Sequence, residues 1–329
     1  MRWREIVKGS AIFFAIYPNI AMNSRFFTRF QIMGLTIIIL TLLIENRKVK
    51  YALGIAAFIL MAIIFVPYSF HYGHDIKTYS QLLKEDEVNI NPFAWLLMKF
   101  STLFMGNPQG LFYLSYVSCL LLCILWMHLN KHNPTLFALT PFLLLGNRAL
   151  KYMAGGVMRN LIALEIASLI PIVSKHEILL GLIALTHIPS IPYIIPLLKL
   201  DWKKAIPIII VGCIIGYLTY PATFHKIAWI GTQTMKGNTP PPRWDFGLWS
   251  NYMMTILSII ILSAYNNQDP IPQILLLLPA FIITRFHCKI RLICMTWLPM
   301  MLLLNKWGET KEEKLIMAFT ALYSLRCNV

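Results

Sequence analysis

The chain carries very little charge for its length. Only 13% of its 329 residues are charged, and Asp and Glu together number 14. A water-soluble domain is usually about 25% charged, so this chain has too little polar surface to cover a soluble globule. With 57% apolar and 13% aromatic residues, an intrinsically disordered chain is excluded as well. The composition therefore predicts an all-α, polytopic helical membrane protein.

Motifs that would bring a cofactor are also absent. The sequence has no GxGxxG, P-loop, HExxH or DxD, and its six cysteines form no CxxC pair. Three of these cysteines lie inside apolar runs, which is typical of small buried side chains rather than of a disulfide framework or a metal cluster. We therefore expect no cofactor, no nucleotide and no protein-chelated metal. A membrane transferase of this kind would draw its energy from an already activated, lipid-linked donor.

Acidic residues are scarce relative to basic ones. The 29 Lys and Arg against 14 Asp and Glu give a net charge of +15. Such a balance often indicates nucleic-acid binding, but apolar runs separate these cations, so we expect no nucleic acid as a partner. Lipid headgroups or an anionic substrate fit the pattern better.

Long apolar segments dominate what is present. A bilayer core about 30 Å thick needs roughly 20 apolar helical residues, and the clearest candidates are 51–70, 110–129 and 205–224. Shorter or interrupted segments raise the prediction to about ten to twelve transmembrane spans. These lie near 10–25, 27–44, 135–150, 159–174, 177–198, 251–265, 273–286, 292–305 and 315–325. We interpret 1–329 as a single integral membrane domain.

Two longer polar segments, 71–91 and 225–250, interrupt the apolar pattern. Segment 92–105 is too short to cross comfortably and predicts an interfacial helix, so the first outer region covers about 71–109. The short basic loop 45–50 indicates the cytoplasmic side, which makes both long loops face outward. Counted over the whole chain, however, Lys and Arg divide evenly between the two sides, so this orientation rests on the N-terminal half.

The predicted outer side is rich in arginine. A guanidinium binds phosphate oxygens in pairs, whereas lysine acts as a hydrated point charge. Outer arginines therefore favour binding of an anionic lipid or a pyrophosphate. The alternative is that they pair with lipid headgroups or with Glu165, the acid deep in a predicted span. The outer arginines are Arg25, Arg29, Arg148, Arg159, Arg243, Arg285 and Arg291.

Two motifs carry candidate chemistry at the predicted outer surface. In GHDIKTY, the carboxylate of Asp75 could accept a proton from a sugar hydroxyl, with Tyr79 four residues on; the alternative is a solvated loop aspartate. In GGVMRNLIA, a helix predicted to start near Arg159 would point its free N–H groups outward beside the guanidinium, which makes an anion site. The alternative is an arginine that snorkels to the headgroups.

Three further patterns follow along the chain. Two prolines just after His187 interrupt an apolar stretch, and such a break implies a wet cavity or protein contacts; the alternative is a satisfied core histidine. Arg285 and Arg291 bound a compact cationic cluster, which could equally be an ordinary basic loop. Arg243 and Trp244 lie in the second long loop, where the tryptophan could stack on a sugar ring or belong to an interfacial aromatic belt.

The order of these motifs resembles that of the EpsG-like and Wzy-type polysaccharide (O-antigen) polymerases of bacteria. The likeness runs over about residues 31–200 and also includes NPFAWLLMKF. The residues that match the family's motifs are Asp75, Tyr79, Arg159, Ala163 and His187. Where the family has a Glu-Pro pair, this chain has Asn91-Pro92 and therefore no carboxylate.

The resemblance implies an enzyme of the bacterial inner membrane whose active site faces the periplasm. Such an enzyme transfers a growing glycan from undecaprenyl pyrophosphate onto the next lipid-linked repeat unit, without a divalent metal or a nucleotide sugar. Arg159, with Arg285 or Arg291, would stabilise the leaving pyrophosphate, supported by His187. Asp75 would position or deprotonate the acceptor hydroxyl. The substrate-binding residues would include Tyr79, Arg148, Arg243 and Trp244.

The partners implied are the undecaprenyl-pyrophosphate-linked oligosaccharide and membrane lipids, and a chain-length-regulating protein is left open. Two other functions remain as alternatives. One is a glycosyltransferase that adds a single sugar from a polyprenyl-phosphate donor, which carries one phosphate and needs fewer arginines. The other is a flippase for the lipid-linked glycan, although flippases tend to have two related halves and no such repeat is visible here.

Overall fold

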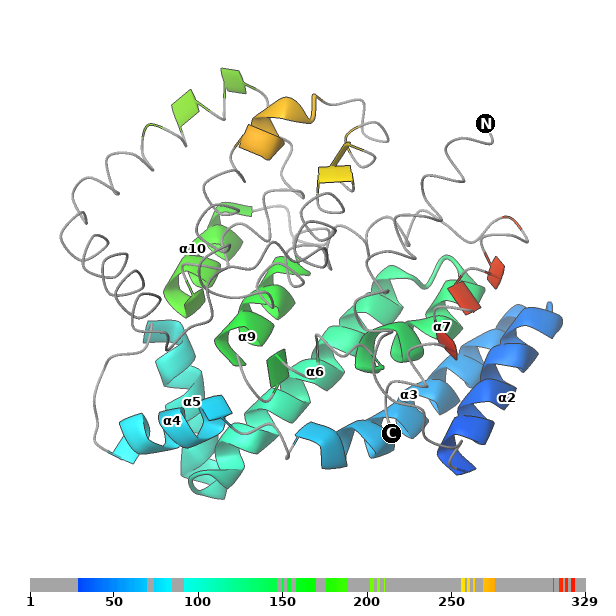
Figure 1. The fold of residues 1–329 in the computed structure, drawn as a ribbon, viewed down its shortest axis with the longest axis horizontal. Coiled ribbons are helices and arrows are strands. Elements are labelled where there is room, and N and C mark those ends of the chain that lie inside the picture. The colour runs from blue at the N-terminus through cyan, green and yellow to red at the C-terminus, as the bar shows by residue number, and fades with distance from the viewer. Residues whose placement is uncertain are drawn as a thin grey trace, which may run out of the picture. The chain divides into compact units, whose positions relative to one another are not determined.

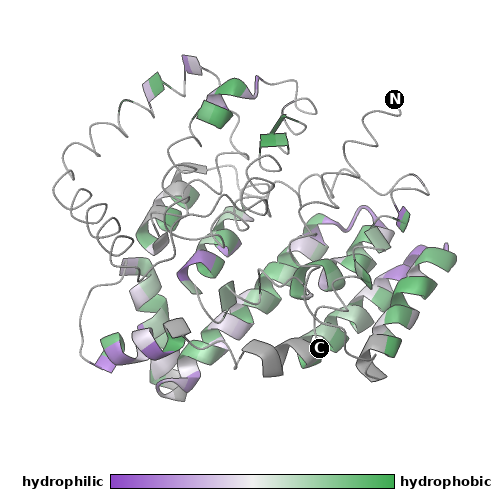
Figure 2. Ribbon diagram, in the orientation of Figure 1, coloured by the Kyte–Doolittle hydropathy of each residue, from purple (hydrophilic) through white to green (hydrophobic). Residues whose placement is uncertain are grey.

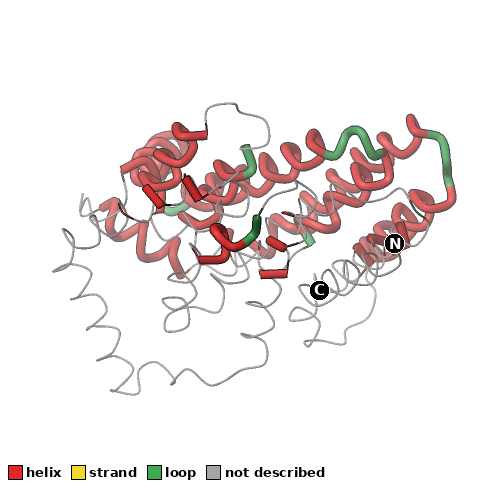
Figure 3. Tube along the Cα trace, turned by 90° about the horizontal axis from the view of Figure 1, so that it is seen from above, coloured by secondary structure: helices red, strands yellow, loops and turns green. Residues whose placement is uncertain are grey.

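The computed structural model describes six longer parts of the chain, 29–69, 74–84, 92–146, 153–154, 158–169 and 176–187, together with shorter pieces. The shorter pieces are 150, 202–203, 206–207, 210, 256–257, 259–260, 263, 269–275, 310, 314–315, 317–318 and 321–322. Within these residues every regular element is an α-helix and no strand occurs (Figure 3), which confirms the all-α prediction.

The chain divides into two compact units, Met1–Ile191 with Met301–Val329, and Pro192–Met300. The labelled helices in Figure 1 all belong to the first unit. They are α2 (Arg29–Leu43), α3 (Arg47–Ser69), α4 (His74–Lys84), α5 (Pro92–Met105), α6 (Gln109–Leu129), α7 (Pro134–Leu145), α9 (Met158–Ala167) and α10 (His176–His187). That 1–329 forms one integral membrane domain stays a prediction.

Several helices follow the apolar segments closely. α2, α3 and α6 occupy the segments predicted as spans at 27–44, 51–70 and 110–129. The short helix predicted over 92–105 is α5, with the same bounds. Local signals explain this agreement: Pro92 stands at the first helical position, where it costs no hydrogen bond, and positive-φ Gly106 follows the last one.

The segment 71–91 was predicted as a loop, and this is wrong for 74–84, where the chain forms α4. The helix is amphipathic: Ile76 and Tyr79 are buried, whereas Lys77 and Thr78 are exposed. Its eleven residues are mostly polar, so the spacing of its few apolar residues gives a weak signal in sequence. Packing of one apolar face is what stabilises so short a helix.

α9 is shorter than the apolar segment predicted as a span at 159–174, because it begins at Met158 and ends at Ala167. α10 covers the first part of the segment predicted at 177–198, and the rest of that segment lies outside the described residues. At 1.5 Å per residue, α9 extends only about 15 Å. Apolar composition predicts burial but does not specify where a helix ends, and Ser168 and Leu169 already form a turn.

α6 is the central helix of the first unit. It contacts α3, α4, α5, α7 and α9, and its 21 residues extend about 31 Å. Among the described residues, it is the one helix that combines the length and the apolar composition needed to cross a membrane. Shorter apolar helices lie at Ile32–Leu43 and Pro134–Leu145. The predicted number of spans therefore stays a prediction.

α3 and α7 pack closely because a glycine lies at their crossing. A Cβ atom on Gly54 would come within 2.6 Å of the Phe137 ring and 3.1 Å of the Ala138 Cα. The Phe137 ring also meets Tyr51 edge to face, with centroids 5.0 Å apart. The Tyr51 hydroxyl donates to the Lys131 carbonyl at 2.5 Å, which ties the start of α3 to the α6–α7 turn.

α5 and α6 form a tight helical hairpin. Gly106, with a φ of 74°, makes the turn, and this left-handed conformation favours glycine. Asn107 donates from its side-chain amide to the Ser80 carbonyl at 2.8 Å. The turn before α6 therefore also holds the C-terminal half of α4, so α4, α5 and the start of α6 form one cluster.

α2, α3 and α6 are coloured as mostly hydrophobic in Figure 2. On α3 and α6, large apolar side chains that are 43 to 55% exposed recur every three or four residues. These side chains are Ile55, Ile59, Ile63, Tyr113, Val117, Leu121 and Ile124. A helix that is apolar on all sides is either a core helix or a membrane span.

Lys50 is buried in this unit, with 7% of its surface exposed. Its Nζ donates to the Thr135 hydroxyl at 2.8 Å. Lys50 precedes the span predicted over 51–70. Burial lowers its pKa from the usual 10.5, the nearby Lys314 ammonium lowers it further, and Glu45 partly offsets both.

This lowered pKa predicts a pH-dependent stability. Between the folded pKa and 10.5 the unfolded chain binds more protons than the folded one, so the free energy of unfolding should rise with pH across that interval. Lys50→Met should lack this rise. Thermal unfolding in detergent from neutral pH to about pH 10 would measure it. If the stability of wild type and variant changes with pH in the same way, the prediction is contradicted.

In the second unit the described residues form short helical pieces. The Trp202 indole donates to Asp269 Oδ2 at 3.3 Å, and Asp269 Oδ1 accepts from the Ile271 amide at 3.0 Å. Ser263 donates to Gln273 Oε1 at 3.2 Å. Asp269 therefore caps the start of the helix at Ile271.

Candidate functional site

The structure brings Tyr79 of α4 and Arg159 of α9 into direct contact. Arg159 Nε donates to the Tyr79 hydroxyl at 2.8 Å. The guanidinium carbon also lies 5.5 Å from the Tyr79 ring centroid, within the range of a cation–π interaction. These two residues are 80 positions apart in the sequence and come from two of the motifs that predicted a site.

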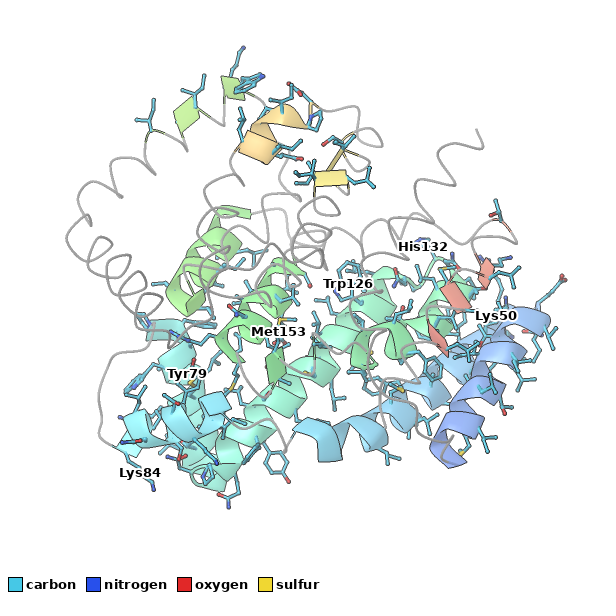
Figure 4. All side chains as sticks on the ribbon, viewed as in Figure 1. Lys50, Tyr79, Lys84, Trp126, His132 and Met153 are labelled. Carbon is cyan, nitrogen blue, oxygen red and sulfur yellow. The ribbon has the colours of Figure 1, made fainter. Side chains whose placement is uncertain are left out.

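Tyr79 is held firmly in its position. It is only 5% exposed and lies three residues after Ile76, which is 1% exposed, so both belong to the packed face of α4. The next residue, Ser80, accepts the hydrogen bond from Asn107. Figure 4 shows Tyr79 near the start of α6. An arginine that bonds to such a tyrosine is oriented by protein contacts, which differs from free snorkelling to the headgroups.

α9 is anchored along α6 by polar contacts that we call the α6–α9 seam. Ser115 donates to the Ala154 carbonyl, just before the glycine pair. Ser118 hydrogen-bonds to the Glu165 carboxyl. The Trp126 indole donates to the Ser168 hydroxyl at 3.1 Å. These contacts fix the register and rotation of α9. They therefore also fix the position of Arg159, which lies in the first turn of α9.

The predicted helix start near Arg159 is confirmed, because α9 begins at Met158. The N-terminal turn of a helix is the positive end of the helix dipole. A guanidinium at this position adds full positive charge to the partial charge of the helix end. The arrangement is therefore electropositive and suited to an anion.

Two other predicted site residues lie on described helices, although their side chains lie outside the described residues. Asp75 is in the first turn of α4, one helical turn before Tyr79. His187 is the last residue of α10, and α10 packs against α9 and α5. The backbone therefore brings all three motif-bearing helices, α4, α9 and α10, into the same unit.

The remaining predicted site residues lie outside the described residues, so their roles stay predictions. These are Arg148, Arg243, Trp244, Arg285 and Arg291. Within the described part of the chain, no group of three or more His, Cys, Asp or Glu side chains could hold a metal ion.

Ser118 was not predicted from the sequence. Pairing with an arginine was one alternative for Glu165, and the structure gives its carboxyl Ser118 of α6 as a hydrogen-bond partner. Arg148 lies outside the described residues, so its pairing with Glu165 stays untested. The available signal was the spacing of small polar residues on an apolar helix, since Ser115 and Ser118 lie three residues apart and so share a face. Buried serines of this kind commonly bond across helices.

Comparison of the chain with protein-family models, curated proteins and solved structures gives no match. The geometry described above and the motif resemblance are therefore the two observations that bear on function. The geometry defines a helical protein with an arginine–tyrosine pair at a helix start, within an apolar scaffold.

Proposed function

We propose that the chain is a polytopic membrane protein that polymerises a lipid-linked glycan. Membrane insertion is supported by the apolar outer faces of α3 and α6, because contiguous exposed apolar surface is rare in soluble monomers. It is also supported by the length of α6, which matches the bilayer core. The bacterial inner membrane is the expected location.

The glycan chemistry is supported mainly by one observation, the contact between Arg159 and Tyr79. The resemblance to polysaccharide polymerases depends on motifs that are far apart in the sequence. The resemblance is better supported when residues from separate motifs, here Tyr79 and Arg159, are in direct contact. The Tyr79 hydroxyl oxygen accepts a hydrogen bond from one of the five N–H groups of the guanidinium, and this bond orients the arginine.

In the proposed reaction, the glycan leaves undecaprenyl pyrophosphate and joins the next lipid-linked repeat unit. Negative charge builds on the departing pyrophosphate, and Arg159 at the start of α9 stabilises it. Asp75 positions or deprotonates the acceptor hydroxyl, and His187 supports the leaving group. No metal or nucleotide takes part in this scheme.

The positions of the loops around α6 support an outward-facing site. The N-terminal end of α6 adjoins α4, through Asn107 and Ser80. Its C-terminal end adjoins the start of α3, through Lys131 and Tyr51. The GHDIKTY motif and the basic loop 45–50 are therefore at opposite ends of a helix of bilayer length. If 45–50 is cytoplasmic, the candidate site faces the periplasm.

Deletion of the gene in its bacterial host tests the proposal. Surface polysaccharide should collapse from a ladder of chain lengths to a single repeat unit on a gel, and plasmid-borne wild type should restore the ladder. Loss of one sugar from every repeat would instead support the single-sugar glycosyltransferase. Accumulation of lipid-linked repeats on the cytoplasmic side would support the flippase. An unchanged ladder would refute the proposed function.

A further inference from the structure

The end of the first unit remote from the candidate site carries a cluster of exposed basic side chains. Arg47 and Lys48 occupy the first turn of α3, and Lys131 and His132 occupy the α6–α7 turn. We call these four residues the basic patch. Figure 4 shows Lys50 and His132 in this region, whereas Tyr79 and Lys84 lie at the other end of α6.

The basic patch is built by tertiary contacts between segments that are 80 residues apart. The Tyr51 hydroxyl bonds to the Lys131 carbonyl, so the turn is held against the first turns of α3. Asn46 caps α3 by accepting from the Lys48 amide at 2.9 Å. The buried Lys50, in the first turn of α3, bonds to Thr135 near the start of α7, and the exposed Glu45 interacts electrostatically with it.

Exposed apolar surface begins directly beside the basic patch. Leu43, the last residue of α2, is 74% exposed, and Ile55 of α3 and Ile124 of α6 are 54% and 49% exposed. Apolar stripes therefore run away from the cations along three helices. A polyanion such as nucleic acid, or an acidic protein, would match the charge but not the adjoining apolar stripes.

We propose that the basic patch binds the anionic phospholipid headgroups of the leaflet opposite the candidate site. Cations at the ends of apolar helix faces lie at the depth of the headgroups when the apolar faces contact the acyl chains. The inference rests on the membrane insertion proposed above and not on the glycan chemistry. It assigns the binding of anionic lipid to four named residues and so adds a second functional surface to the protein.

The test uses full-length protein purified in a neutral detergent and titrated with phosphatidylglycerol or phosphatidylcholine. Thermal unfolding read by tryptophan fluorescence reports binding, because a ligand of the folded state raises the midpoint. Phosphatidylglycerol should stabilise the wild type at lower concentration than phosphatidylcholine does. In the double variant Lys48→Gln/Lys131→Gln, the half-maximal phosphatidylglycerol concentration should rise about twenty-five-fold, at about fivefold per surface cation.

The matched control is Lys77→Gln/Lys84→Gln, which removes two exposed lysines of α4 near the other end of α6. Its half-maximal concentration should equal that of the wild type. Equal shifts in both double variants, or equal stabilisation by the two lipids, would overturn the inference while leaving membrane insertion intact. A wild type that stays in solution without detergent would overturn both. Polymer length on gels tests the glycan chemistry separately.

Discussion

Arg159→Ala should leave the protein inserted and folded but lower chain extension at least about a hundredfold, because removal of one preorganised charge-stabilising donor costs this much. Single repeat units should accumulate on the acceptor lipid. The measurement is the length distribution of surface polysaccharide in a deletion strain that expresses the variant. Its amount in the membrane fraction, compared with wild type, establishes that the protein is present.

Two related variants test the role of the Arg159–Tyr79 contact. Arg159→Lys should restore little chain extension to the deletion strain, because an ammonium cannot reproduce the planar fork of the guanidinium. Tyr79→Phe keeps the ring under the guanidinium but removes the hydroxyl that accepts from Nε. It should reduce chain extension about tenfold, in line with loss of one hydrogen bond to a charged group. Normal polymer length in Arg159→Ala would remove this residue from the mechanism.

Gly110→Ala should be the most damaging small substitution in the scaffold. An added Cβ would lie 2.6 Å from the Ser101 carbonyl carbon and 2.7 Å from the Thr102 Cα. These are backbone atoms of α5 and cannot rotate away, so the α5–α6 hairpin must open. We expect a loss of about 3 kcal/mol in the free energy of unfolding, at the upper end of typical overpacking costs. The midpoint of thermal unfolding in detergent would measure it.

The control for this substitution is Gly181→Ala in α10. A Cβ at this position would meet nothing within 4 Å, and alanine favours helix over glycine by about 1 kcal/mol. The variant should be as stable as the wild type or slightly more so. If Gly110→Ala and Gly181→Ala unfold at the same temperature, the close approach of α5 and α6 is wrong.

The sequence predicted the helices whose signals are local. α5 begins at Pro92 and ends before Gly106, and both residues act through their own backbone conformation. α3 and α6 are continuous apolar runs, which need no knowledge of their neighbours to be recognised. α4 was missed because two buried residues, Ile76 and Tyr79, carry its packing, and that packing depends on other helices.

The sequence by itself determined the secondary-structure class, because its long apolar segments predicted helices and the described residues are all helical. That the chain is a membrane protein stays a prediction from its composition. The sequence also identified Tyr79 and Arg159, each within its own motif. Only the tertiary structure decided that they meet, because helix pairing depends on side chains far apart in the chain. Gly54 and Gly110 allow close approach, and the α6–α9 seam fixes the register. A residue pattern encodes which face of a helix is buried, but complementary surfaces decide which helix covers it.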